Sequence, residues 1–190
     1  MGKNSKLPAA KIAIFAILTA LSLALSLLEQ MIPLGLLIPV PGIRLGLSNI
    51  VTMFAVFYFG ALPALLILIC RIFLLLLLSG NVSSFFLSLC GGLFALSVML
   101  VLKRWYGRFF SLYGISVGGA CAHNIGQILG AVVLLSSQAA FFYLPVLLLT
   151  GACTGILTAF VTLTLFYAID RSNILSRYQT GTESKRQKLR

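Results

Sequence analysis

The sequence predicts an all-α integral membrane protein, a bundle of six transmembrane helices with both termini in the cytoplasm. Of its 190 residues, 60% are hydrophobic and only 9% are charged. The mean hydropathy is +1.09, and the apolar runs are longer than soluble core helices require, so lipid is the expected solvent. Lys and Arg gather at the ends of these runs, which is where cations set membrane topology.

The basic charge and the cysteines exclude several other classes of protein. A net charge of +11 would favour nucleic-acid binding in a soluble chain, but here the cations flank apolar segments, so no nucleic-acid partner is expected. The four cysteines lie inside apolar runs, with no C-x-x-C spacing and no histidine at metal-ligand distance. We expect buried free thiols, no disulfide, no metal and no cofactor. These cysteines are Cys70, Cys90, Cys121 and Cys153.

The first apolar run covers residues 12–28 and follows a short basic head. It is longer than the apolar region of a signal peptide, and its small-x-small site lies inside the run, so a retained helix is expected. Ala16, Ala20 and Ala24 recur every four residues, a ridge that lets another helix approach closely. Packing within the chain and contact with a separate subunit are both open, and the spacing alone favours the first.

Five further spans are expected after the first. Glu29 ends the first helix, and residues 30–43 form a connection with three of the six prolines. Residues 1–170 form a single transmembrane domain, and residues 171–190 form a basic tail that we expect to be disordered. The further spans cover residues 45–59, 63–78, 85–102, 110–135 and 143–169.

The distribution of cations predicts the orientation of these spans. With six spans, the basic head, the loop after the fourth span and the basic tail all fall on one side of the membrane. The turns at residues 79–84 and 136–140 contain no cation. Because positively charged loops stay inside, both termini are expected in the cytoplasm.

The stretch from Pro39 to Thr52 mixes prolines, glycines, an arginine and a Ser-Asn pair at the mouth of an apolar segment. This mixture is costly beside lipid, so we expect it to fold back over protein, with a helix starting near Ile43. Ser48 and Asn49 then share one sector of that helix. Substrate binding is one interpretation. The other is that Arg44 extends to lipid headgroups and Asn49 hydrogen-bonds a neighbouring helix.

Arg71 lies within the third expected span, ~13 Å from either end at the rise of an α-helix. A central arginine costs at least ~2.5 kcal/mol on insertion scales, so it should face the bundle interior and have a partner. Glu29 is the only acidic residue before the cytoplasmic tail and is the candidate counter-ion. A structural role for Arg71 and binding of an anionic group are both open.

The fifth expected span is the most polar. His123, Asn124 and Gln127 occupy about 100 degrees of arc, so several donors and acceptors share one sector. A lone intramembrane histidine beside amides is more often an interhelical hydrogen-bonding residue than a proton relay. On the same span a ladder of small residues predicts a smooth groove for a neighbouring backbone. Its members are Gly114, Gly118, Ala122, Gly126 and Gly130.

On the predicted topology, these polar residues lie in the outer half of the bundle or near its midplane. The inner half is nearly pure hydrocarbon. A polar cavity biased to the outside fits capture of a small solute, with an anionic group, better than a through-channel.

Three segments carry a family resemblance: residues 41–60, 60–80 and 116–135, with their GLSNIVT and AHNIGQ strings. They resemble the bacterial Gx transporter family, whose members are also described as heptaprenyl diphosphate synthase component I. The resemblance covers roughly residues 12–168. That family is similar in layout to the S components of energy-coupling-factor (ECF) transporters, which have six helices and a site beneath the first loop near the outer face.

The resemblance implies a multi-pass protein of the bacterial cytoplasmic membrane that binds a small solute and works with a transmembrane coupling subunit and ATPases. It implies that the GLSN and AHNxxQ residues line the site and that the alanines of the first span contact the coupling subunit. With the two arginines, the candidate substrate-binding residues are Arg44, Ser48, Asn49, Arg71, His123, Asn124 and Gln127.

The chain is not expected to be an enzyme. Prenyl diphosphate synthases hold Mg²⁺-bound diphosphates through clusters of aspartates, and this sequence contains a single aspartate, Asp170. It contains neither a P-loop nor an evident nucleophile-base pair. The alternative to transport is therefore a membrane accessory subunit in isoprenoid or quinone biosynthesis, or in extracytosolic electron transfer.

Overall fold

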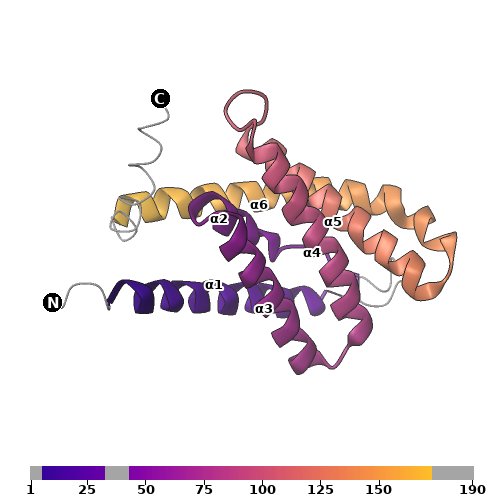
Figure 1. The fold of residues 1–190 in the computed structure, drawn as a ribbon. Coiled ribbons are helices and arrows are strands. Elements are labelled where there is room, and N and C mark those ends of the chain that lie inside the picture. Colours follow the sequence, from indigo (N-terminus) through magenta and orange to yellow (C-terminus); the bar gives the residue numbers. More distant parts are fainter. Residues whose placement is uncertain (1–5, 33–42, 173–190) are drawn as a thin grey trace.

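The computed structural model describes residues 6–32 and 43–172, and α-helices make up most of this part of the chain (Figure 1). A short 3-10 helix, η2 (Gln138–Tyr143), leads into the last of them. Most of the predicted connection at residues 30–43 and nearly all of the basic tail lie outside the described residues. The α-helices are α1 (Lys6–Gln30), α2 (Asn49–Tyr58), α3 (Ala61–Ser79), α4 (Val82–Lys103), α5 (Leu112–Leu135) and α6 (Leu144–Ser172).

Five helices of the described chain are long and apolar enough to cross a membrane, and this confirms an all-α, multi-pass membrane protein. The shorter apolar helix is α2, with 10 residues. At the rise of an α-helix it is about 15 Å long, roughly half the hydrocarbon thickness of a bilayer. The number of complete spans and their orientation therefore stay predictions.

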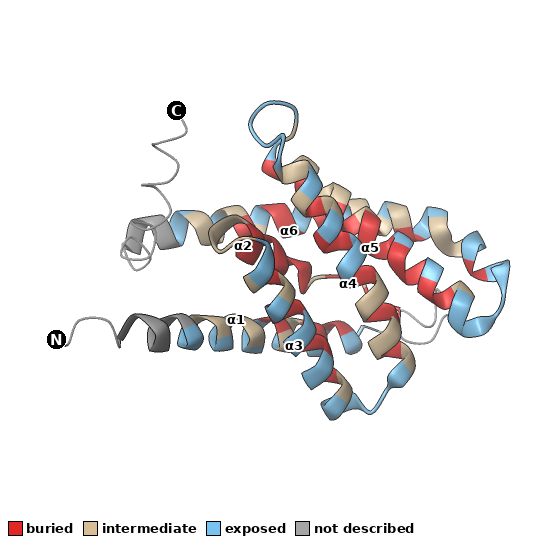
Figure 2. Ribbon diagram, viewed as in Figure 1, coloured by how far each residue is buried: buried red, intermediate tan, exposed pale blue. Residues whose placement is uncertain are grey.

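The expected helix start near Ile43 is wrong, because α2 begins at Asn49. Gly46 has a φ of +85°, a left-handed conformation that suits glycine and interrupts helix at this point. The Glu29 carboxylate accepts a hydrogen bond from the Leu47 N–H, just before the helix. Residues 43–48 are buried or half-buried (Figure 2), as irregular backbone at membrane depth must be.

The helices pack so that α2 lies inside the bundle. α1 packs on α2 and α3, α4 packs on α5, and α6 packs on α5 and α2. The beginning of α1 and the end of α6 lie on the same side of the bundle, at the left of Figure 1. The turn between α5 and α6 lies at the opposite side.

The predicted groove on α5 is confirmed at Gly126, whereas Gly118 and Gly130 of the same ladder meet side chains of α4. A Cβ added to Gly126 would lie 2.7 Å from the carbonyl oxygen of Cys90 on α4, so the two backbones approach too closely for a side chain. A Cβ on Gly155 of α6 would similarly lie 2.7 Å from the Cα of Val117 on α5. Close backbone approach on two sides of α5 holds its polar residues between α4 and α6.

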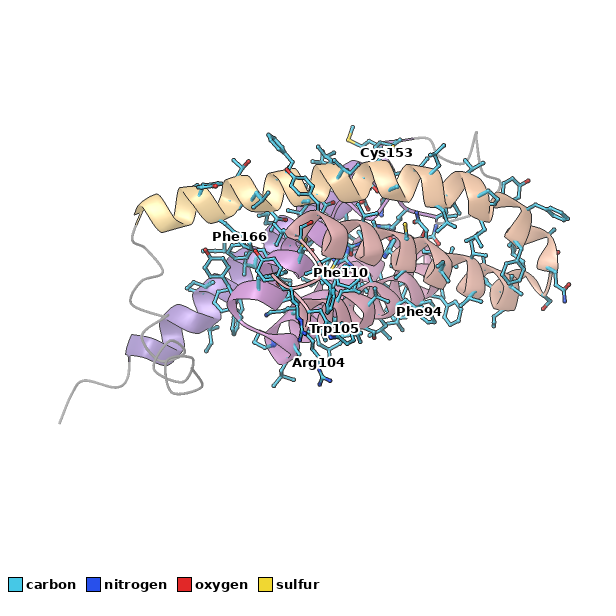
Figure 3. All side chains as sticks on the ribbon, turned by 90° about the horizontal axis from the view of Figure 1, so that it is seen from above. Phe94, Arg104, Trp105, Phe110, Cys153 and Phe166 are labelled. Atoms are coloured by element: carbon cyan, nitrogen blue, oxygen red, sulfur yellow. The ribbon has the colours of Figure 1, made fainter. Side chains whose placement is uncertain are left out.

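The second half of α2 packs its aromatic side chains against α6. The ring centroid of Phe166 on α6, labelled in Figure 3, lies 5.8 Å from that of Phe54 and 5.1 Å from that of Tyr58. The first turn of α2, by contrast, carries the buried polar residues Asn49 and Thr52. The helix thus changes from polar to aromatic along its length.

The expectation of buried thiols is wrong, although all four cysteines are free as predicted. Cys70 and Cys153 are exposed, and Cys90 and Cys121 are half-buried. Cys153 points away from the bundle on the outer side of α6 (Figure 3). The two exposed thiols lie on outward faces of apolar helices, which lipid rather than protein would cover.

Candidate functional site

All seven candidate substrate-binding residues are buried in the bundle. Arg44 is 5% exposed and Arg71 2%, so neither guanidinium reaches the surface of the protein. The remaining five are 2% exposed or less, and they are Ser48, Asn49, His123, Asn124 and Gln127.

Arg71 connects three helices. It lies on α3, and its Nη1 donates to the Ser26 Oγ on α1 at 3.0 Å and to the Ser48 Oγ, immediately before α2. The expectation that Arg71 faces the interior is therefore confirmed by the geometry. Its position fixes α1 and α2 against α3 through charge-assisted hydrogen bonds.

Arg44 also points inward, so the interpretation that it extends to lipid headgroups is wrong. Its Nε donates to the Ser84 Oγ at 3.0 Å, and its Nη1 donates to the Ser26 carbonyl oxygen at 3.2 Å. Its backbone N–H donates to Gln127 Oε1 at 3.3 Å.

Glu29, the expected counter-ion, does not hydrogen-bond either guanidinium. Its Oε1 accepts from the Leu47 N–H, and its Oε2 has no hydrogen-bond partner in the described chain. An anion at the beginning of α2 is stabilised by the helix dipole. The buried core around Arg44 and Arg71 therefore holds two guanidinium groups and one carboxylate, an excess of one positive charge.

Gln127 and His123 form a directed hydrogen-bond chain. The Arg44 N–H donates to Gln127 Oε1, which orients the amide so that Gln127 Nε2 faces His123 Nε2 at 3.1 Å. An amide nitrogen only donates, so His123 Nε2 accepts. This network assigns the neutral imidazole with its proton on Nδ1. The hydrogen bond of His123 is to a residue of its own helix, so Gln127, and not His123, links α5 to the segment before α2.

The imidazole of His123 lies between two glycines. A Cβ added to Gly91 on α4 would lie 2.9 Å from ring atoms Nδ1 and Cε1. One added to Gly46 would lie 3.0 Å from Cδ2 of the same ring and 2.9 Å from Asn49 Nδ2. The ring is thus held between α4 and the segment before α2, beside the Asn49 amide.

Asn124 takes part in a different contact. Its Nδ2 donates to the Leu147 carbonyl oxygen, so its side chain binds α6. A Cβ added to Gly151 would lie 3.5 Å from Asn124 Cγ, which confirms close packing at this point. The other six candidate residues lie in or against the segment at residues 43–48, whereas Asn124 belongs to the α5–α6 contact.

Two residues of this core, Ser26 and Ser84, were not among the predicted site residues. Ser26 binds both guanidinium groups, and it has a sequence signal: Ser22, Ser26 and Glu29 lie four and three residues apart, on one face of an otherwise apolar helix. All three are buried. Ser84 also binds Arg44, and its N–H is capped by Asn81 Oδ1 at 2.9 Å.

The alanine ridge of α1 points away from the bundle. Ala16, Ala20 and Ala24 are exposed, whereas Ser26 and Glu29 on the other face are buried (Figure 2). The interpretation favoured by spacing alone, packing within the chain, is therefore wrong. Contact with a separate subunit stays a prediction.

The sequence matches the model of the family described as heptaprenyl diphosphate synthase component I over residues 18–165, well over half of its length. The chain belongs to this family. The matched range begins in α1 and ends in α6, so it contains every polar residue of the core described above. No curated protein and no solved structure matches the chain, so the expected likeness to ECF S components stays a prediction.

The heptaprenyl diphosphate synthase component I family is described as one component of a synthase, which agrees with the expectation that this chain is not itself the enzyme. The described residues contain no group of three or more His, Cys, Asp or Glu side chains that could hold a metal ion. What the polar core offers is hydrogen-bond donors and an excess positive charge. It is suited to binding and holding an anion.

Proposed function

We infer that this chain is the non-catalytic membrane component of an isoprenoid-synthesising assembly. The family match over residues 18–165 carries this proposal. Mg²⁺ takes oxygen ligands such as clustered carboxylates, and the sequence has one aspartate, Asp170, at the end of its last expected span. A partner therefore supplies the diphosphate chemistry.

The membrane component gives that partner a place at the bilayer. Each CH₂ group of a growing prenyl chain gains about 0.8 kcal/mol on leaving water, so the product enters lipid as it lengthens. A catalytic subunit attached to the membrane releases such a product directly into it. The exposed ridge of Ala16, Ala20 and Ala24 is where we expect a helix of a partner to pack, because small side chains allow close approach.

Affinity purification from native membranes tests this proposal. The tagged chain is solubilised in a mild detergent, and the proteins that co-purify are identified by mass spectrometry. Enrichment of a polyprenyl diphosphate synthase subunit is expected. Enrichment of a transmembrane coupling subunit with two ATPases, and no synthase, would contradict it.

A receptor for a small anionic solute, as in ECF S components, is the second candidate function. It is favoured by the buried charges of Arg44 and Arg71, because ionisable residues inside membrane bundles are costly and usually functional. On this proposal the site consists of these two arginines with Ser48, Asn49, His123, Asn124 and Gln127. Mass spectrometry of small molecules retained by the purified chain, together with the identity of its partners, distinguishes the two functions.

A further inference from the structure

The Arg71 guanidinium makes hydrogen bonds through only one of its three nitrogens in the described chain. Nη1 donates to Ser26 and Ser48, but Nε and Nη2 have no hydrogen-bond partner among the described residues. These two nitrogens form the side-on fork of the guanidinium, whose parallel N–H groups match two oxygens of one oxyanion. The side chain is only 2% exposed, so water outside the protein does not satisfy this fork.

Two further unpaired donors lie one helical turn from the residues that bind Arg71. Ser22 precedes Ser26 by four residues on α1, and Thr52 follows Ser48 by four at the first turn of α2. The hydroxyls of Ser22 and Thr52 are fully buried and have no hydrogen-bond partner in the described chain.

α1 and α2 run in opposite senses: Glu29 near the end of α1 binds Leu47 just before α2, and the ring of Phe15 lies 5.3 Å from that of Phe59 just after it. The step back to Ser22 and the step forward to Thr52 therefore lead in the same direction along the bundle. α1, α2 and α3 also pack against one another. α1, α2 and α3 each therefore carry an unpaired donor on or one turn from the residues that join them through Arg71.

Charge points to the same kind of ligand. The core contains Arg44, Arg71 and Glu29, and His123 is neutral in the assigned network, so one positive charge is uncompensated. A buried charge without a partner costs several kcal/mol. A bound anion removes this cost and satisfies the free donors together.

We propose that the Nε–Nη2 edge of Arg71, with the hydroxyls of Ser22 and Thr52, binds a phosphate group between α1, α2 and α3. The guanidinium fork takes two phosphate oxygens. The two hydroxyls reach further oxygens, which a carboxylate does not have. The phosphate is either free in solution or part of a membrane lipid, because both present the same oxygens.

Binding is measured on the full-length chain, purified in detergent and free of added phosphate. Equilibrium dialysis against radiolabelled inorganic phosphate detects the free ion, with acetate as competitor. Phosphorus analysis of an organic extract of the same protein detects a lipid phosphate. Saturable binding near one phosphate per chain, in one of the two assays, is expected.

Matched valine substitutions locate the site. Thr52→Val removes a hydroxyl that the proposal assigns to phosphate, and Thr162→Val removes another buried, unpaired hydroxyl on α6. Loss of one hydrogen bond to a charged group weakens binding by about tenfold or more. We expect this loss in Thr52→Val, wild-type binding in Thr162→Val, and a still larger loss in Arg71→Lys, which keeps the charge but not the fork.

Several outcomes overturn the proposal. They are the absence of bound phosphorus in both assays of the wild-type chain, equal binding by the Thr52→Val and wild-type chains, and displacement of phosphate by equimolar acetate. The assays of the wild-type chain can contradict the proposal without any variant. The test therefore remains valid even if Arg71→Lys does not fold. Co-purification of a synthase is a separate readout, so failure of the proposed function is distinguishable from failure of this inference.

Discussion

Arg44 and Arg71, from different segments of the chain, bind the same residue of α1. Arg44 Nη1 donates to the carbonyl oxygen of Ser26 at 3.2 Å, and Arg71 Nη1 donates to its hydroxyl at 3.0 Å. One position in the first helix thus organises both buried cations.

Ser26→Ala is expected to destabilise the protein by about 1–3 kcal/mol, because it removes an acceptor of a buried guanidinium. Ser88→Ala is the matched control, since it removes a buried serine hydroxyl on α4 that has no hydrogen-bond partner in the described chain. The free energy of unfolding of both variants is measured in detergent and phosphate-free buffer. Equal loss in the two variants would contradict the role of Ser26.

Gly91→Ala is expected to cost about 1–3 kcal/mol, because its Cβ meets Gln127 Cγ and the His123 ring. Gly92→Ala is expected to cost less, since its Cβ meets only the end of the Leu68 side chain. Combining Gly91→Ala with His123→Ala should recover part of the cost. A double-mutant cycle on unfolding free energies checks this, and strictly additive effects would show that the ring is not the obstacle.

Cysteine labelling tests the predicted orientation. In a variant with the four native cysteines replaced by alanine, Arg104→Cys and Ser137→Cys introduce exposed thiols on opposite connections of the bundle. The positive-inside rule predicts that a membrane-impermeant maleimide labels the first only in inside-out vesicles and the second only in intact cells. The reverse labelling pattern would show that the chain has the opposite orientation in the membrane.

Ala20→Leu is expected to leave stability within about 0.5 kcal/mol of wild type, because Ala20 is exposed on the outer face of α1. The larger side chain should nevertheless reduce partner recovery in the affinity purification severalfold. Val133→Leu, on the exposed part of α5, is the control for added bulk on another face. Unchanged recovery with Ala20→Leu would remove the alanine ridge from the interface.

The long helices were predictable from the sequence because apolar length and flanking cations define them. The span expected over residues 85–102 corresponds to α4 (Val82–Lys103), and the one expected over 110–135 corresponds to α5 (Leu112–Leu135). α2 was not predictable in this way. Its start depends on the positive φ of Gly46 and on a carboxylate from α1, which hydropathy does not register.

The sequence predicts those site residues whose charge would be costly beside lipid, because such a residue must face the interior of the bundle. Arg71 follows this rule. Arg44 does not, because its position near the end of a span is equally compatible with lipid headgroups. Its side-chain partner Ser84 is 40 residues away and its backbone partner Gln127 is 83 residues away, and neither spacing leaves a local pattern.

The shortness of α2 has a consequence for how the polypeptide enters the bilayer during synthesis. A ten-residue helix preceded by irregular backbone has too little apolar length to leave the translocon on its own. The acceptor for the backbone N–H of Arg44, in the segment before α2, is translated 83 residues later. We therefore expect α2 to enter the bilayer together with the helices translated after it, and its polar segment to be completed only when α5 has been made.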